Sequence, residues 1–210
     1  MPRIVCALAL ALVTACSTTS SPITDPKHPA PDVTLGIGLL VGGASAESAG
    51  ASQDFTGGAV GGRLDVTAPT SDSGMVELGL RVGLVGASLE PELIPFGGRH
   101  ELDARQIQVA PMARFWFLDR EETVRPYCEA FVGYQSTDFE ERYTISGLTT
   151  SLDYDDSGLF AGLGLGVAIR LSETSGTQLV LGGEWEHSEF RDLDGSSDGI
   201  FFHAGTRWEF

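Results

Sequence analysis

The segment Asp192–Asp198 places three carboxylates around a glycine, an arrangement that could bind a cation. Carboxylate oxygens at this spacing suit Ca²⁺, so Asp192, Asp194 and Asp198 are the candidate metal ligands of the chain. No glutamate follows at the distance at which an EF-hand loop supplies its bidentate ligand. A solvated acidic loop is the simpler interpretation, and we therefore expect no cofactor.

His187 and Ser188 are neighbours, and a histidine beside a serine suggests a hydrolase in which one activates the other. Adjacent residues of a strand point to opposite faces, so these two side chains cannot readily share a hydrogen bond. We therefore expect no catalytic residues and a protein that is not an enzyme. His203 is most simply a hydrogen-bonded interior histidine.

Charged residues of both signs recur at alternate positions of several segments. If these segments are strands, the charges share one face and nearly balance, which predicts mutual ion pairing inside a closed sheet. The predicted network consists of Arg63, Asp65, Glu77, Arg81, Arg114, Glu129, Arg170, Glu184, Glu186 and Arg207. Glu184 and Glu186 could act as a catalytic carboxylate pair, but the facing arginines favour ion pairing.

The elements that carry these residues are predicted to be strands, because apolar and polar residues alternate with period two. Each strand reaches the ~9–11 residues that a tilted membrane strand needs. Pro111 lies inside one of them, where we expect a bulge, because proline donates no ladder hydrogen bond. The eight predicted strands span residues 33–43, 55–67, 75–88, 105–118, 125–137, 157–171, 177–190 and 199–210.

The face opposite the charges is apolar through the middle of every predicted strand, as Leu159, Leu163 and Leu165 illustrate. A charge there would cost ~2–4 kcal/mol at the midplane of a bilayer. The pattern therefore predicts an all-β fold: an eight-stranded antiparallel up-and-down transmembrane β-barrel. Such a barrel is just wide enough for its own side chains, so we expect a filled lumen with salt bridges.

The N-terminal sequence indicates that the protein is exported. Residues 1–15 combine a basic start, a short apolar stretch and small residues, as in a signal peptide. Val13–Cys16 resembles a bacterial lipobox, which implies lipidation of Cys16; ordinary cleavage after Ala15 is the alternative. Residues 16–32, rich in Ser, Thr and Pro, are predicted to be a flexible tether. The predicted barrel covers residues 33–210, in which Cys128 is the single cysteine.

The chain ends on Trp208-Glu-Phe210, with aromatic residues at alternate positions. Together with the eight alternating strands, residues 33–210 resemble the small eight-stranded bacterial outer-membrane β-barrel family, typified by the OmpA transmembrane domain and OmpX. The resemblance implies an integral protein of the Gram-negative outer membrane with both termini in the periplasm. It also implies that the barrel-assembly machinery recognises Phe210, and that the role is structural or one of surface interaction.

The net charge of the chain narrows the classes of partner that it can bind. The formal net charge of −16 argues against nucleic-acid binding, which needs a basic surface. The predicted outer connections 138–156 and 191–198 are acidic and would meet outer-membrane lipid and lipopolysaccharide, with divalent cations as a conceivable bridge. We expect a monomer.

Two alternatives to this reading remain. One is a lipid-tethered periplasmic barrel of lipocalin type with an apolar ligand inside, which requires apolar side chains inside and charges outside. The other is a lipid-A-modifying barrel enzyme.

Overall fold

The computed structural model describes residues 33–48, 54–70, 74–91, 98–145, 147–172, 176–192 and 195–210. The predicted signal peptide, Cys16, the tether and Asp194 lie outside these residues. The described ranges form strands and contain no helix long and apolar enough to cross a membrane. The strands are β1 (Thr34–Ser48), β2 (Asp54–Pro69), β3 (Val76–Pro91), β4 (Arg99–Trp116), β5 (Val124–Ile145), β6 (Leu148–Arg170), β7 (Thr177–Phe190) and β8 (Gly195–Glu209).

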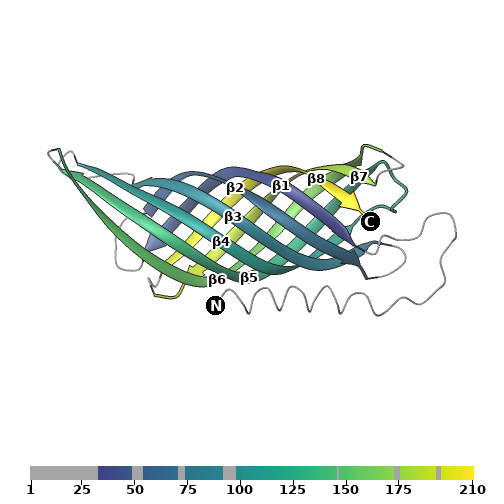
Figure 1. Cartoon of the computed structure of the whole chain (residues 1–210), viewed down its shortest axis with the longest axis horizontal. Coiled ribbons are helices and arrows are strands. Elements are labelled where there is room, and N and C mark those ends of the chain that lie inside the picture. The colour runs from purple at the N-terminus through teal and green to yellow at the C-terminus, as the bar shows by residue number, and fades with distance from the viewer. Residues whose placement is uncertain are drawn as a thin grey trace.

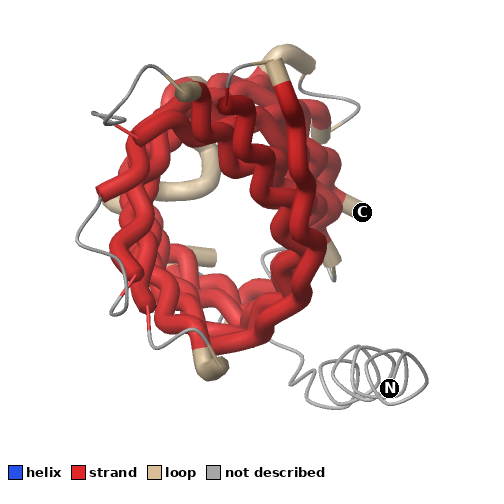
Figure 2. Tube along the Cα trace, turned by 90° about the vertical axis from the view of Figure 1, so that its left-hand side faces the viewer, coloured by secondary structure: helices blue, strands red, loops and turns tan. Residues whose placement is uncertain are grey.

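Each strand pairs antiparallel with its neighbours in sequence, and β1 also pairs with β8, so the sheet closes into a barrel. Figure 1 shows the tilted strands from the side, and Figure 2 shows the closed ring. Phe210 completes the closure, because its backbone N–H donates to the Val33 carbonyl at 3.0 Å. The predicted fold class, an eight-stranded antiparallel up-and-down barrel, is confirmed.

The two ends of the barrel differ. We call the end that carries the β2–β3, β4–β5 and β6–β7 connections and the C-terminus the turn end. We call the opposite end, with the β1–β2, β3–β4, β5–β6 and β7–β8 connections, the hairpin end. In Figure 1 the C-terminus marks the turn end at the right, and the β5–β6 hairpin projects at the upper left. Successive connections therefore lie at opposite ends, as the up-and-down order of the strands requires.

The strands run farther into the hairpin end than predicted, and the prediction of a loop over 138–156 was wrong. β5 and β6 pair without interruption to Ile145 and Leu148. The segment is rich in Thr, Tyr and Phe, residues that favour extended structure, and its acidic residues lie between them. The tip turns at Gly147, whose φ of +83° suits a residue without Cβ.

The predicted bulge at Pro111 was also wrong. Val109 pairs with Tyr134 and Met112 with Phe131, so the register is the same on both sides of the gap at Ala110 and Pro111, and no extra residue is inserted. The Pro111 side chain faces outward and is exposed. The ladder tolerates the missing N–H without a shift, because the neighbouring pairs on both sides hold the register.

The outward face is apolar and the inward face is charged. Leu39, Leu163 and Leu165 are 70, 60 and 66% exposed, whereas Arg81 and Arg207 inside the barrel are each 1% exposed. This arrangement is the opposite of the one that the lipocalin-like alternative requires. An apolar outer surface is what contact with acyl chains demands.

Small residues let large side chains fill the interior. A Cβ at Gly164 would lie 2.8 Å from Glu129 Cγ, and one at Gly162 would lie 2.3 Å from the Phe131 ring. The backbone of β6 therefore approaches the side chains of β5 at the level where the charges gather. Above this level, toward the hairpin end, an apolar cluster of Phe55, Leu89, Leu102, Ala104, Phe139 and Phe190 occupies the interior.

A charge on the outward face should destabilise the barrel according to its depth. Leu165→Arg, in the middle of β6, is expected to lower the free energy of unfolding in lipid vesicles by about 2–4 kcal/mol. Val124→Arg, at the outward end of β5 beside a turn, should cost only about 0–1 kcal/mol. Urea titration followed by tryptophan fluorescence measures both, and equal losses in the two variants would contradict lipid contact at Leu165.

Candidate functional site

The inward charges of five strands converge on one cluster. Arg81 reaches three carboxylates, with Nε 3.0 Å from Asp65 Oδ1, Nη2 2.6 Å from Glu129 Oε1 and Nη1 3.0 Å from Glu184 Oε2. Arg63 Nη1 lies 3.1 Å from Glu129 and 2.5 Å from Glu184. Period-two alternation explains this convergence, because Arg63 and Asp65 lie two residues apart on β2 and share its inner face.

Arg114 completes the cluster from β4. Its Nη2 lies 3.0 Å from Asp65 Oδ2 and 2.8 Å from Glu129 Oε2. We call Arg63, Arg81, Arg114, Asp65, Glu129 and Glu184 the central ion cluster. It contains equal numbers of guanidinium and carboxylate groups, so the buried charges neutralise one another, which is the condition for tolerating them.

A second ion pair lies nearer the turn end. Arg207 Nη2 bonds a carboxylate oxygen of Glu77 and donates to Thr34 Oγ1 at 3.2 Å. Thr67 Oγ1 donates to the other oxygen of Glu77 at 2.9 Å. Arg114 Nη1 is 4.0 Å from Glu77 and thereby connects this pair to the central ion cluster. The network thus extends from the central ion cluster toward the turn end.

Two residues of the predicted network, Arg170 and Glu186, do not join the ion pairs of the interior. Arg170 does not reach the interior charges: its guanidinium donates to the backbone carbonyls of Arg120 and Glu121 in the β4–β5 connection. Its position at the last residue of β6 is the physical reason. Glu186 is buried but binds Gln108 rather than an arginine, with Gln108 Nε2 donating to Oε2 at 3.0 Å.

Aromatic side chains that the sequence reading did not assign to this site flank the cluster. The Arg81 guanidinium lies 4.3 Å from the centre of the Phe131 ring. Arg114 lies 4.8 Å from Tyr127, and Arg207 lies 4.7 Å from Trp116. Such cation–π contacts add to the ion pairs. The signal was present in the sequence, because Tyr127 and Phe131 alternate with Glu129 on the inner face of β5.

His203 lies inside the barrel, where its ring nitrogens contact Arg63 and its Nε2 is 2.8 Å from Tyr127 Oη. Ligand atoms of Glu129, Glu184 and His203 lie within 4.8 Å of one another, close enough to hold a metal. Arg63 and Arg81 already bond both carboxylates, however, so the geometry supports ion pairing rather than metal binding at this point.

The described calcium candidates, Asp192 and Asp198, are not gathered into a metal site. The Asp192 backbone N–H donates to both carboxylate oxygens of Asp156 at 3.1 Å. Asp198 Oδ1 lies 3.1 Å from His187 Nδ1. Within the part of the chain that the structure describes, Asp192 and Asp198 do not belong to a group of three or more close ligand atoms.

The serine candidates are also dispersed. Ser188 points inward and donates to Gln135 Oε1 at 3.0 Å, whereas His187 lies beside Asp198 at the exposed surface. Gly195–Gly199 spells the Gly-x-Ser-x-Gly pattern of hydrolases, but all five residues belong to β8. The hydrolase motif instead needs a sharp turn between a strand and a helix.

Removing one arginine should show how far the barrel depends on this cluster. Arg81→Met leaves three buried carboxylates short of a partner and is expected to lower the free energy of unfolding by about 3–5 kcal/mol. Arg142→Met, which breaks exposed pairs with Glu140 and Asp103, should change it by less than about 1 kcal/mol. Urea unfolding of the refolded barrels measures the difference. Equal stability of the two variants would exclude a structural role for the cluster.

Several solved structures share this architecture. The outer membrane protein OprG from Pseudomonas aeruginosa is 14% identical, with a TM-score of 0.51 over 87% of this chain and 97% of that one. The outer membrane protease OmpT from Escherichia coli is 8% identical, with a TM-score of 0.54 over 92 and 100%. Neisserial surface protein A is 16% identical, with a TM-score of 0.42 over 84 and 97%. At these identities the likeness to OprG and OmpT shows the fold alone.

Comparison with curated proteins gives no match. The family model for the outer membrane protein beta-barrel domain, by contrast, matches residues 7–210, which is nearly the whole chain. This match agrees with the closed barrel, its apolar outer surface and its ionic interior. The chain belongs to the outer-membrane β-barrel family.

Proposed function

We propose that this chain is a non-enzymatic outer-membrane barrel that presents a rigid sheet for interaction at the cell surface. In this proposal the turn end and both termini face the periplasm, and the hairpin end faces outward. The observation that carries it is the length of β4, β5 and β6. β5 and β6 pair as far as Ile145 and Leu148, whereas β6 and β7 stop pairing at Gly158 and Phe190.

The projecting part of β4, β5 and β6, which we call the projecting sheet, has a long open edge along β6. Among the described residues, positions 148–155 of β6 pair with β5 and have no pairing partner in β7. An exposed strand edge offers backbone donors and acceptors to an added extended segment. Natural barrels normally keep such edges short, so a long open edge supports a role in binding.

The two faces of the projecting sheet have different chemistry. The inner face, continuous with the lumen, exposes Ile145, Leu148 and Leu152 to 61, 78 and 54%. The outer face carries alternating charges, among them Glu140 and Arg142, whose side chains bond at 2.7 Å. A partner that adds to the edge would therefore meet an apolar face and a charged face, which supplies specificity.

Side-chain contacts hold the projecting sheet rigid. The His100 and Tyr143 rings stack with centroids 4.2 Å apart, and His100 Nε2 lies 2.6 Å from Glu141 Oε1. Tyr143 donates its hydroxyl to the same carboxylate. Partial burial, together with this hydrogen bond, raises the pKa of Tyr143 to about 12, so the phenol remains a donor at neutral pH. A preordered surface binds at a lower entropic cost.

The sealed interior supports a role outside the lumen. Carboxylates that are bonded to arginines cannot serve as free general acids or bases, which supports a non-enzymatic role.

The outcome expected in planar-bilayer recording is little or no conductance, because the central ion cluster fills the cross-section. Stable large openings of the wild-type barrel would show that the lumen conducts.

Shortening the projecting sheet tests the surface role. A variant in which residues 141–152 are replaced by Asn-Gly keeps the β6–β7 pairing and should still fold, as a shift on boiling in gel electrophoresis would show. Both barrels are placed in nanodiscs. The shortened barrel should bind severalfold less cell-surface protein than the full-length barrel, and quantitative mass spectrometry of the retained protein measures the difference. A barrel with Glu189→Gln, an exposed change on β7, is the control. Equal retention by the shortened and full-length barrels would refute the proposal.

A further inference from the structure

The open edge of β6 presents its backbone groups in a known order. The Arg191 N–H donates to the Ser157 carbonyl at 3.2 Å, so the backbone groups of Ser157 point away from β5. β5 and β6 pair without interruption, and backbone direction alternates along a regular strand. The residues that share the parity of Ser157 therefore direct their N–H and C=O groups to the open edge; among positions 148–155 these are Thr149, Ser151, Asp153 and Asp155.

The side chains of the same residues lie on the outer face, where negative charge is in excess. Asp153 and Asp155 are exposed and lie directly opposite Glu140 and Asp138 of β5. Like charges in directly opposite positions repel one another. Glu140 bonds Arg142 at 2.7 Å, whereas within the described ranges no cationic group forms an ion pair with Asp153 or Asp155. The edge thus combines free backbone groups with two uncompensated carboxylates.

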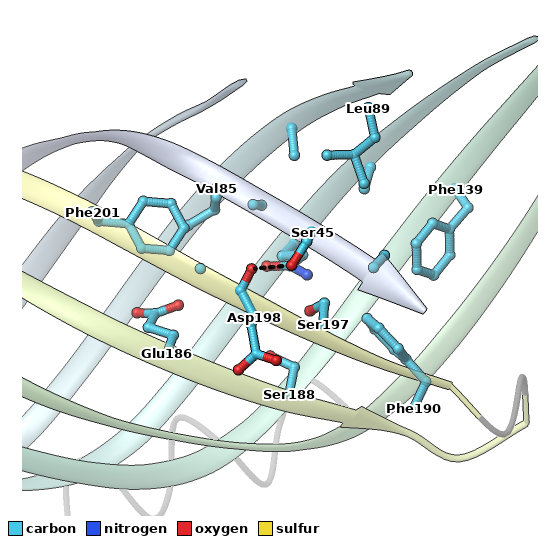
Figure 3. Close-up of a pocket in the computed structure, with 16 residues that line it drawn as sticks. Ser45, Val85, Leu89, Phe139, Glu186, Ser188, Phe190, Ser197, Asp198 and Phe201 are labelled. Carbon is cyan, nitrogen blue, oxygen red and sulfur yellow. Dashed lines mark hydrogen bonds between the residues drawn. The ribbon is translucent and has the colours of Figure 1, made fainter. Parts of the chain in front are cut away.

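The inner side of the edge is apolar and held in place. The Tyr154 and Phe139 rings stack with centroids 5.1 Å apart, and Phe139 packs edge-on against Phe190 at 5.3 Å. Figure 3 shows Phe139 and Phe190 on the same side of the interior. The last side chain of β7 therefore points into the barrel rather than along the edge of β6. Leu152, which is 54% exposed, continues the apolar side toward the tip.

We propose that the edge of β6 binds an extended segment of a partner protein in which arginine or lysine alternates with aliphatic residues. The segment adds antiparallel to β6, with two cationic side chains opposite Asp153 and Asp155 and aliphatic side chains opposite Leu152 and Tyr154. This assignment rests on the proposed surface role and names the class of partner that fits it. A second copy of the chain fits the edge less well, because each copy carries a formal net charge of −16 and the two repel.

Fluorescence anisotropy of the dye-labelled peptide Arg-Val-Arg-Val-Thr-Val-Thr tests the pairing on the full-length barrel in phosphatidylcholine nanodiscs. With its first residue opposite Asp155, the peptide directs the N–H groups of its arginines and threonines toward β6 and those of its valines away. We expect saturable binding. N-methylation of the second arginine and the first threonine should weaken it at least about tenfold, because two backbone hydrogen bonds are lost. N-methylation of the first two valines is the matched control and should leave binding unchanged.

Variants of the barrel test the charges. Asp153→Asn combined with Asp155→Asn should weaken binding of the arginine peptide severalfold, and so should glutamate in place of both arginines of the peptide. Glu121→Gln combined with Glu122→Gln removes two exposed carboxylates at the turn end and is the control for net charge. Equal binding of the two methylated peptides would overturn strand addition. Equal binding by the two double variants, or association of nanodiscs with one another through residues 148–155, would overturn the basic partner.

The barrel shortened over residues 141–152 separates this proposal from the surface role. It lacks most of the edge and should not bind the arginine peptide. If shortening reduces the retention of surface protein but the full-length barrel does not bind the peptide, the surface role holds and the basic partner is wrong. Equal retention of surface protein by the two barrels refutes the surface role itself.

Discussion

The central ion cluster is the constraint on which the rest of the barrel depends. Three guanidiniums and three carboxylates lie side by side in the buried interior, and each is tolerated because the others neutralise it. The cluster can form only if the strands pair in one register, since a slip by one residue would turn Asp65 and Arg81 outward. Ion pairing inside and apolar contact outside therefore enforce the same arrangement.

The cluster also explains why glycine is frequent on the inner face of β6. Glu129 and Phe131 of β5 occupy the room that side chains at positions 164 and 162 would otherwise need. The interior is consequently divided along the barrel axis into aromatic packing around Trp116, the ion cluster, and an apolar region near Phe139. The division separates the ionic middle from the projecting sheet at the hairpin end.

The likeness to OprG and OmpT illustrates how little the fold says about function. Both share the barrel architecture with this chain at 14 and 8% identity, and one of them is named as a protease. Function in such barrels belongs to the side chains at one end and in the lumen, because the scaffold itself is generic. In this chain the features on which the proposed surface role rests are the open edge of β6 and the His100–Tyr143 stack.

The sequence by itself determined the fold class, the number of strands and the face to which each residue belongs, because period-two alternation is a local property. Leu163 and Arg81 could be assigned to opposite sides of the sheet without coordinates. Tertiary structure decided which charges meet. Arg170 has the right parity but ends its strand at the turn end, and Glu186 has the right parity but meets Gln108. It also decided how far β5 and β6 continue, because an acidic stretch such as 138–156 suits both a solvated loop and the outer face of a strand. Depth along the barrel axis and cross-strand register are non-local, and period alone does not encode them.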